Sequence, residues 1–199
     1  MMGLLASLLL AILQVPQPFL AKDATAEQLI AACRTRLPAT AELSGRLLLV
    51  NRKGIVKKEH GYVLRRTPSG TELEVDGERL SPPETNARIA ETDVTWSDLT
   101  LDYLSWTDYC LDPEQKSENV LGVDCARVLL RQGDRTIRAW VSYRFGAMMQ
   151  AEELKGTETV RRLWATRVKT FGERQMPNLI LVETVGSGHR TKITVEELK

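Results

Sequence analysis

Residue types that could carry out catalysis are few in this chain of 199 residues, which has two histidines and three cysteines. The cysteines form no Cys-x-x-Cys pair, so the spacing typical of a zinc site is missing. The sequence also lacks the Gly-x-Ser-x-Gly motif of serine hydrolases, the His-Glu-x-x-His motif of metalloproteases and a phosphate-binding glycine loop. His60 could meet Asp98 in space, but a strand histidine between Glu59 and Gly61 is expected to face solvent. We therefore expect a protein that is not an enzyme, with no catalytic residues, no metal and no cofactor.

Two of the cysteines are spaced so that they could form a disulfide. Cys110 and Cys125 flank a polar loop, residues 112–119, between two strand-like segments. In an oxidising compartment they could close a disulfide worth ~3 kcal/mol by chain-entropy reasoning. Two unpaired, half-buried thiols are the alternative, because the connectivity of cysteines cannot be deduced from sequence. Cys33 is expected to pack as a small apolar side chain.

Apolar side chains on predicted strands are the other candidates for function. Residues 47–50 are apolar in a row, which indicates a strand with non-aqueous surroundings on both faces. Met148 and Met149 form a pair whose thioethers adapt to varied apolar shapes. Alternation along the strands suggests nine residues that could line an apolar cavity. For each of them ordinary core packing is the alternative. The nine residues are Leu48, Val50, Val63, Leu101, Trp106, Trp140, Met148, Leu163 and Leu181.

Strands must position most of these side chains. Period-two alternation between glycine-containing turns is typical of an antiparallel meander. It predicts strands at residues 44–51, 55–66, 71–75, 126–131, 136–142, 147–154, 159–170, 179–184 and 189–196, with a break at Met176–Asn178. With two helices, this pattern predicts an α+β fold built on a strongly curved, mainly antiparallel sheet.

The N-terminal part of the chain predicts export and then a helix. Residues 3–15 form an uncharged apolar run that is too short to cross a bilayer and suits a signal peptide, residues 1–21, cleaved near Ala21 or Ala24. A short buried helix is the alternative. No cysteine follows the run closely, so we expect no lipid anchor. Residues 26–36 are predicted to form a helix, capped by Asp23 or Thr25 and ending before Pro38.

A second, short helix is predicted between the two blocks of strands. Thr95 and Asp98 fit a capping box that opens a helix from Trp96 to about Leu104. Such a helix can act as a lid over one mouth of a curved sheet, and Trp96, Leu99 and Tyr103 fall on its apolar face. An ordinary crossover helix on a sheet without a cavity is the alternative.

Composition and charge limit the classes of partner. The formal net charge is +1, so a nucleic-acid partner is not indicated. Residues 22–199 have a length that suits a single domain. Pairs of basic residues occur beside strands at residues 52–53, 57–58, 65–66 and 161–162. We interpret these pairs as a solvent-exposed face.

The order of these elements resembles the LolA/LolB-like superfamily, and more closely the bacterial family of outer-membrane lipoprotein-sorting proteins. Each motif is weak alone, but their order and spacing are fairly specific, and they span nearly all of the chain after the signal peptide. The residues that carry the resemblance are Asp93–Leu99, Cys125 before its strand, Trp140–Ser142 with Gly146 after it, Met176–Pro177 and Gly188–Ile193.

The resemblance implies an incomplete β-barrel around an apolar cavity, covered by helices. It implies a monomeric periplasmic carrier or chaperone that binds lipoprotein acyl chains or another lipid. An inner-membrane lipoprotein exporter and an outer-membrane receptor are the implied partners. It also suggests that Arg66 holds the lid, although the hairpin here is shorter and lacks the family's aromatic partner at Gly70–Glu72. The alternative function is an envelope-stress sensor of the same fold that signals through a partner protein.

Overall fold

One large antiparallel sheet of twelve strands forms the body of the protein. The computed structural model describes residues 19–80 and 87–199, so most of the predicted signal peptide lies outside the described residues. The strands are β1 (Ala41–Asn51), β2 (Val56–Thr67), β3 (Gly70–Val75), β4 (Glu78–Leu80), β5 (Asp108–Leu111), β6 (Ser117–Val120), β7 (Val123–Gln132), β8 (Arg135–Ser142), β9 (Met148–Lys155), β10 (Glu158–Phe171), β11 (Arg174–Thr184) and β12 (His189–Leu198).

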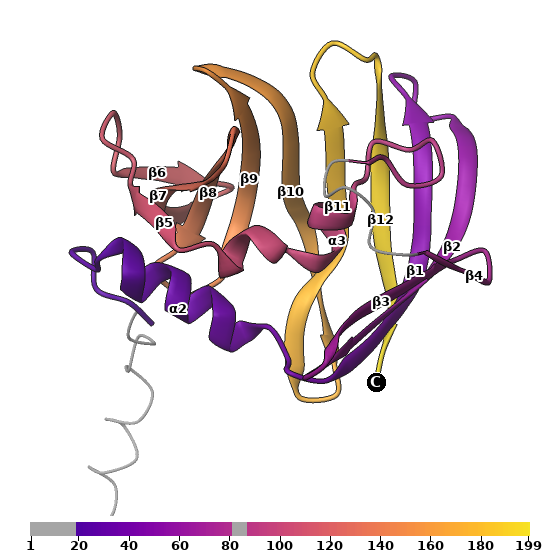
Figure 1. Ribbon diagram of the computed structural model, residues 1–199, viewed down its shortest axis with the longest axis horizontal. Helices are drawn as coiled ribbons and strands as arrows, with labels where there is room; N and C mark the ends of the chain where they lie inside the picture. Colours follow the sequence, from indigo (N-terminus) through magenta and orange to yellow (C-terminus); the bar gives the residue numbers. More distant parts are fainter. Residues whose placement is uncertain (1–18, 81–86) are drawn as a thin grey trace, which may run out of the picture.

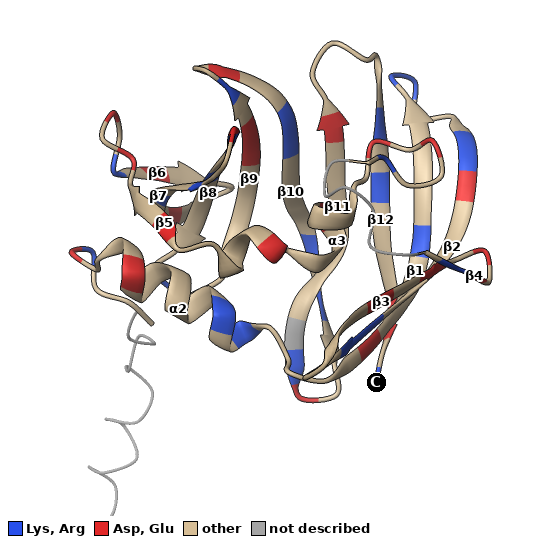
Figure 2. Cartoon of the chain, in the orientation of Figure 1, with Lys and Arg blue, Asp and Glu red and all other residues tan. Residues whose placement is uncertain are grey.

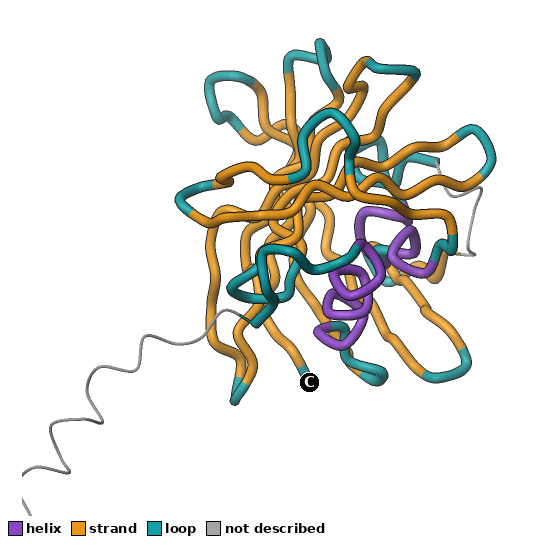
Figure 3. The backbone as a smooth tube through the Cα atoms, turned by 90° about the vertical axis from the view of Figure 1, so that its left-hand side faces the viewer, coloured by secondary structure: helices purple, strands orange, loops and turns teal. Residues whose placement is uncertain are grey.

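The strand order is β4-β3-β2-β1-β12-β11-β10-β9-β8-β7-β5, with β6 also paired to β7. The end strands β4 and β5 are not paired to each other, so the sheet is curved but open (Figure 1). Figure 3 shows the strands curving to either side of the helices. This architecture confirms the predicted fold class, an incomplete antiparallel barrel with two helices.

The pairing of β1 with β12 joins the first strands of the chain to the last ones. Leu47 lies opposite Ile193, and the register shifts by one residue between Ser44 and Gly45. A Cβ at Gly45 would lie 1.8 Å from the carbonyl oxygen of Thr194, so only glycine fits this close approach. The sheet is therefore continuous across the N- and C-terminal halves of the sequence.

The first helix, α2, spans Ala26–Arg36 as predicted. Its capping box is formed by Thr25 and Gln28, with the Thr25 backbone N–H donating to Gln28 Oε1 at 2.9 Å. The backbone turns extended at Leu37, because the proline that follows disfavours the helical region there. Among residues 19–80 and 87–199, no helix has the length and apolarity needed to cross a membrane.

The second helix is shorter than predicted. α3 spans Trp96–Thr100 and opens with the predicted capping box of Thr95 and Asp98. Leu101 adopts a left-handed conformation, with φ of 53°, which ends the helix well before Leu104. A 3-10 helix, η2, follows at Asp102–Ser105. The predicted single helix is therefore two short segments with a sharp bend between them.

One other expectation about local structure is wrong, and the structure decides between the two alternatives left open for Cys110 and Cys125. β11 continues through Pro177, where a break was predicted. In the described register, Pro177 lies opposite Val168 of β10 beside a register shift and has no partner on β12, and such irregular positions tolerate proline. Cys110 lies opposite Leu129 on β7, four residues along that strand from Cys125. Four strand residues span ~13 Å, beyond disulfide reach, and all three cysteines are free.

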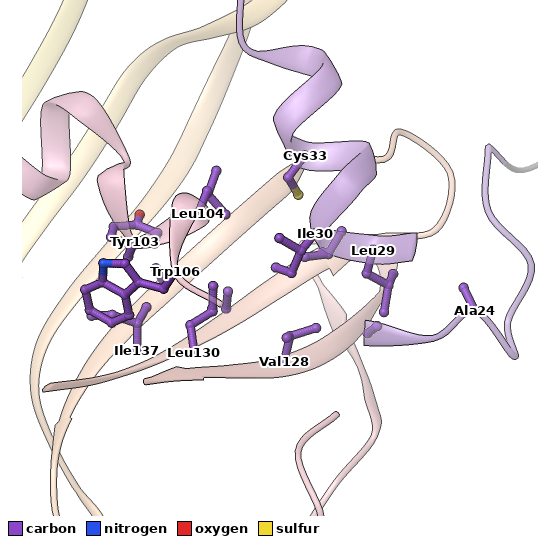
Figure 4. Packing of buried hydrophobic residues seen from close by; sticks show 14 of the residues in the cluster. Ala24, Leu29, Ile30, Cys33, Tyr103, Leu104, Trp106, Val128, Leu130 and Ile137 are labelled. Carbon is purple, nitrogen blue, oxygen red and sulfur yellow. The ribbon is translucent and has the colours of Figure 1, made fainter. Parts of the chain in front are cut away.

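Two apolar clusters fill the same face of the sheet. The α2 cluster packs α2 and η2 on β7, β8 and β9, and Figure 4 shows Leu29 and Ile30 directed toward Val128 and Leu130. The α3 cluster packs the residues around α3 on β1, β2, β3, β10, β11 and β12. Its buried members are Leu47, Tyr62, Leu64, Leu73, Val75, Ile89, Val94, Trp96, Leu163, Val182 and Ile193. Ala151 and Leu163 are register partners on adjacent strands, so the two clusters share one face.

A third, small cluster lies on the opposite face. It consists of Val120, Cys125 and Trp140, with Val123 and Met149 packed against them. We call this face the outer face of the sheet and the helix-covered one the inner face.

Candidate functional site

Four of the predicted lining residues lie in the inner-face clusters. Trp106 is buried in the α2 cluster, and Leu101 packs against this cluster. Leu163 is buried in the α3 cluster. Met148 packs against both clusters and accepts a hydrogen bond from the Tyr103 hydroxyl at 3.6 Å. Met148 therefore lies at the junction of the two halves of the interior.

The other predicted lining residues lie elsewhere. Leu48, Val63 and Leu181 alternate with members of the α3 cluster along their strands, so they belong to the outer face. Trp140 is in the outer cluster, where its indole N–H donates to Glu118 at 3.0 Å. Val50 is fully buried but lies outside the three clusters. Assigning Leu48, Val63, Leu181 and Trp140 to an inner cavity was wrong, because the sequence does not reveal which face of each strand turns inward.

The predicted lid residues contact both clusters. Trp96 is buried in the α3 cluster and Leu99 packs against it, whereas Tyr103 is buried in the α2 cluster. The bend at Leu101 turns Tyr103 away from the direction of α3. We call residues 89–105, which run from the start of this loop through η2, the α3 segment. It covers the line along which the two apolar clusters meet.

The cavity directly beneath α3 is small, and its lining combines charged side chains with the apolar Ile137, Ala151 and Leu163. Its volume is about 20 Å³, which is room for a single water, and charged side chains from α3, β8, β9 and β10 line it. The sequence left open whether this helix covers an apolar cavity or packs on a sheet without one, and the small cavity found here favours the second alternative. The apolar side chains of the inner face pack against one another and against the α3 segment instead.

Arg161 of β10 is the centre of the charged network beneath α3. Its guanidinium pairs with Asp98 of α3, lies 3.0 Å from Glu153 of β9 and donates to the carbonyl oxygen of Asp93 at 2.8 Å. Burial opposes the charge of Arg161, but Asp98 and Glu153 outweigh this and raise its pKa. Arg135 of β8 extends the network, 3.4 Å from Glu153.

This network corrects one expectation from the sequence. The pair Arg161–Arg162 was interpreted as part of a solvated face, yet the Arg161 side chain is only 14% exposed. Arg162 is exposed as expected, because neighbouring strand residues point to opposite faces. Asp98 pairs with Arg161, while His60 pairs with Asp76 at 2.7 Å, so His60 and Asp98 do not form a joint site.

Two further polar contacts attach the α3 segment to the sheet. Arg66 of β2 donates to the carbonyl oxygen of Thr100, the last residue of α3, at 2.6 Å. Partial burial lowers the pKa of Arg66. Before the helix, Asp93 is fully buried and lies 2.9 Å from His189 Nδ1, and its backbone N–H donates to Thr191 at 2.9 Å. Asp93, Arg161 and His189 were not predicted as site residues; their only signal was that Asp93 and His189 lie within the resembling motifs.

Known proteins match this chain in fold. No protein-family profile and no curated protein sequence matches it. A LolA superfamily protein from Nitrosomonas europaea has a TM-score of 0.66 and 13% identity, over 88% of this chain and 93% of that one. A DUF1329 family protein from Desulfovibrio piger has a TM-score of 0.64 and 16% identity, over 87% of this chain and 90% of that one.

A third solved structure carries a description close to the resemblance noted in the sequence. It is named as the domain of an outer membrane lipoprotein-sorting protein of Vibrio parahaemolyticus, with a TM-score of 0.62 and 10% identity. The match covers 87% of this chain and 89% of that domain. Together with the open twelve-stranded sheet and its two covering helices, these matches show that the chain has the LolA-like fold.

Proposed function

We propose that this protein is a periplasmic carrier that binds the acyl chains of a lipoprotein and takes part in outer-membrane lipoprotein sorting. The observation that carries the proposal is the way the α3 segment is attached. It covers an apolar face, but several of its links to the sheet are polar: Arg161 to Asp98, Arg66 to Thr100, and Asp93 to His189. Such links can be replaced by water when the segment moves.

The conformation of the backbone supports movement of the α3 segment as a unit. Ala90 and Glu91 have φ of 49° and 54°, and Leu101 has φ of 53°. Left-handed backbone costs non-glycine residues roughly 1 kcal/mol each. Residues with left-handed backbone therefore flank, on both sides, the stretch that contains Val94, Trp96 and Leu99. Rotation at these points relieves strain and uncovers the α3 cluster.

An acyl chain would then replace the apolar contacts that the α3 segment makes with the sheet. Each buried methylene contributes ~0.8 kcal/mol, so part of one chain is enough for useful binding without polar contacts. Under this proposal Met148, Leu163, Leu101 and Trp106 contact the guest. The role of the protein is then binding and delivery, without a chemical step.

The remaining parts of the proposal concern the route of the cargo. The mature protein, without residues 1–21, acts as a monomer between an inner-membrane exporter and an outer-membrane receptor. Arg66 keeps the lid residues Trp96, Leu99 and Tyr103 on the sheet until cargo arrives. The LolA-like fold supports this assignment, because one of the matching structures is named for lipoprotein sorting.

The test is whether the purified protein removes a diacylated lipoprotein from vesicles. We expect a soluble complex after the vesicles are sedimented, with the acylated peptide detected in it by mass spectrometry. Met148→Gln should reduce this uptake at least about tenfold, because it places an amide among the apolar contacts of the interior. Met149→Gln is the matched control: Met149 is the next residue, is also half-buried, and packs on the outer face.

Two results would count against the proposal. One is an uptake of lipoprotein no greater than that of an unrelated protein, together with no lipid in the purified sample. The other is an equal effect of Met148→Gln and Met149→Gln, which would place binding outside the inner face. Folding of both variants is checked by circular dichroism, so that unfolding is not mistaken for lost binding.

A further inference from the structure

The turn between β1 and β2 presents two apolar side chains between two pairs of basic ones. The stretch reads Arg-Lys-Gly-Ile-Val-Lys-Lys over residues 52–58. Ile55 is 54% exposed and Val56 is 47% exposed, at the tip and at the start of β2. Exposed large apolar side chains that occur next to each other indicate a contact surface. The inner face, which is proposed above to bind acyl chains, does not include these two residues.

The neighbouring turn adds to the same surface. The β11–β12 turn lies beside the β1–β2 turn at one edge of the sheet (Figure 1), and a Cβ at Gly188 would be 3.8 Å from Arg52 Nε. This second turn exposes Val185 at 48%. Arg190, opposite Val50 in the β1–β12 register, is also exposed. We call the combined surface the basic edge: Arg52, Lys53, Ile55, Val56, Lys57, Val185 and Arg190.

The basic edge has an excess of positive charge, although the whole chain is close to neutral. Figure 2 shows basic residues at the β1–β2 turn and along the adjoining part of β12. Within the described part of the chain, none of its four cations takes part in an ion pair. The nearby carboxylates are engaged: Glu59 binds Arg46, and Glu91 binds Lys58. Glu183 is half-buried and lies opposite Arg162.

We propose that the basic edge docks the protein onto an anionic lipid bilayer. Ile55, Val56 and Val185 enter the interface between headgroups and acyl chains, while the surrounding lysines and arginines bind the lipid phosphates. One weak signal gives only marginal membrane binding, whereas a small apolar anchor combined with a cluster of cations gives stable binding. Lys58 links this edge to Glu91, so docking brings the start of the α3 segment close to the membrane.

The experiment measures flotation of the full mature chain with vesicles that contain no lipoprotein. One set contains phosphatidylcholine with about one third phosphatidylglycerol, and the other contains phosphatidylcholine alone. We expect binding to the anionic vesicles, weakened as sodium chloride is raised, and at least about tenfold weaker binding to the neutral ones. Because no cargo is present, this result is independent of lipoprotein uptake.

Two variants test the two halves of the proposed surface. The charge variant is Arg52→Gln with Lys53→Gln and Lys57→Gln, and it should weaken binding to anionic vesicles at least about tenfold. The apolar variant is Ile55→Ser with Val56→Ser, and it should also weaken binding about tenfold, at every salt concentration. All five side chains are exposed at or beside a turn, so both variants are expected to fold.

A stretch of similar composition near the opposite end of the sheet provides the control. Arg167, Val168 and Lys169 on β10 are exposed, with Val168 at 62%. The control variant, Arg167→Gln with Val168→Ser and Lys169→Gln, should bind as the parent protein does. The proposal is overturned if this control loses as much binding as the β1–β2 variants. It is also overturned if neutral vesicles bind equally well, or if no vesicle binds at low salt.

Discussion

Arg66 of β2 donates a hydrogen bond of 2.6 Å to the carbonyl oxygen of Thr100, where α3 ends. This contact joins a hairpin at one end of the sheet to the middle of the α3 segment. On the opposite side of the same helix, Arg161 of β10 pairs with Asp98. Strands that are distant in the sheet order therefore both attach to a helix of five residues. The position of α3 on the sheet therefore depends on contacts with these arginines as well as on apolar packing.

Replacing Arg66 by methionine should loosen the α3 segment without unfolding the protein. The variant keeps the aliphatic part of the side chain and loses a charged hydrogen bond, worth about 1.5–3 kcal/mol when partly buried. We expect faster amide hydrogen exchange across residues 94–104 and faster uptake of a lipid-like fluorescent probe. The matched control is Arg79→Met, since Arg79 is exposed and pairs with the exposed side chain of Glu72. Unchanged exchange in Arg66→Met would show that this contact does not hold the segment.

Stability should depend on pH through Asp112, which connects β5 to β7 and β8. Its carboxylate is buried, 2.5 Å from Arg127 and 3.1 Å from Arg138. Burial by itself would raise the pKa of Asp112, but the Glu114 backbone N–H and the Arg127 guanidinium outweigh it and lower the pKa. A lowered folded pKa means that this stabilisation is present above the unfolded pKa of about 3.9 and is lost as pH falls through the folded value.

Asp112→Asn should therefore cost about 3 kcal/mol of unfolding free energy at pH 6, because two buried guanidinium groups lose their carboxylate. The difference between parent and variant should shrink below about pH 4, because Asp112 of the unfolded parent chain binds a proton there while the folded protein binds one only at lower pH. Urea unfolding at pH 6 and pH 3 measures both values. Asp108→Asn is the control, since Asp108 is exposed and its ion pair with Arg131 is long, at 3.9 Å. A difference that stays constant with pH would contradict the assignment.

The three cysteines should differ sharply in reactivity. Burial raises the pKa of Cys33 and of Cys125 to about 12 each, so both thiols stay protonated at pH 8. Cys110 is only half-buried. Iodoacetamide at pH 8 should modify Cys110 alone in the native protein, and all three cysteines after unfolding without a reductant. Intact-mass measurement counts the added groups. A single added group after unfolding would instead indicate the disulfide that the fold does not allow.

The local elements were largely predictable, because local rules set them. Alternation and glycine turns located most strands to within a few residues. Thr25 and Thr95 are side-chain caps whose partners lie three residues away, so both helix starts could be predicted from neighbouring residues alone. The end of α3 could not, because nothing in the sequence around Leu101 marks a left-handed residue.

The site was predicted less well, and Trp140 and Met148 show why. Both are apolar residues of adjacent strands, yet Trp140 packs on the outer face and Met148 on the inner one. Alternation divides the residues of a strand into two sets but does not say which set faces the helices. That choice depends on a register shift between Trp140 and Val141 and on the path of distant strands.

The sequence by itself determined that this chain forms an antiparallel sheet with two short helices, because alternation, turns and caps act over a few residues. Tertiary structure alone decided that Arg161 is buried against Asp98 and that the lid residues pack on the inner face. It also decided that Cys110 and Cys125 lie apart. The contact of Arg161 with Asp98 depends on segments far apart in sequence being brought together, and the separation of the two cysteines depends on the register of β5 on β7. The pairing of β1 with β12, which joins the two ends of the chain, likewise has no local signal.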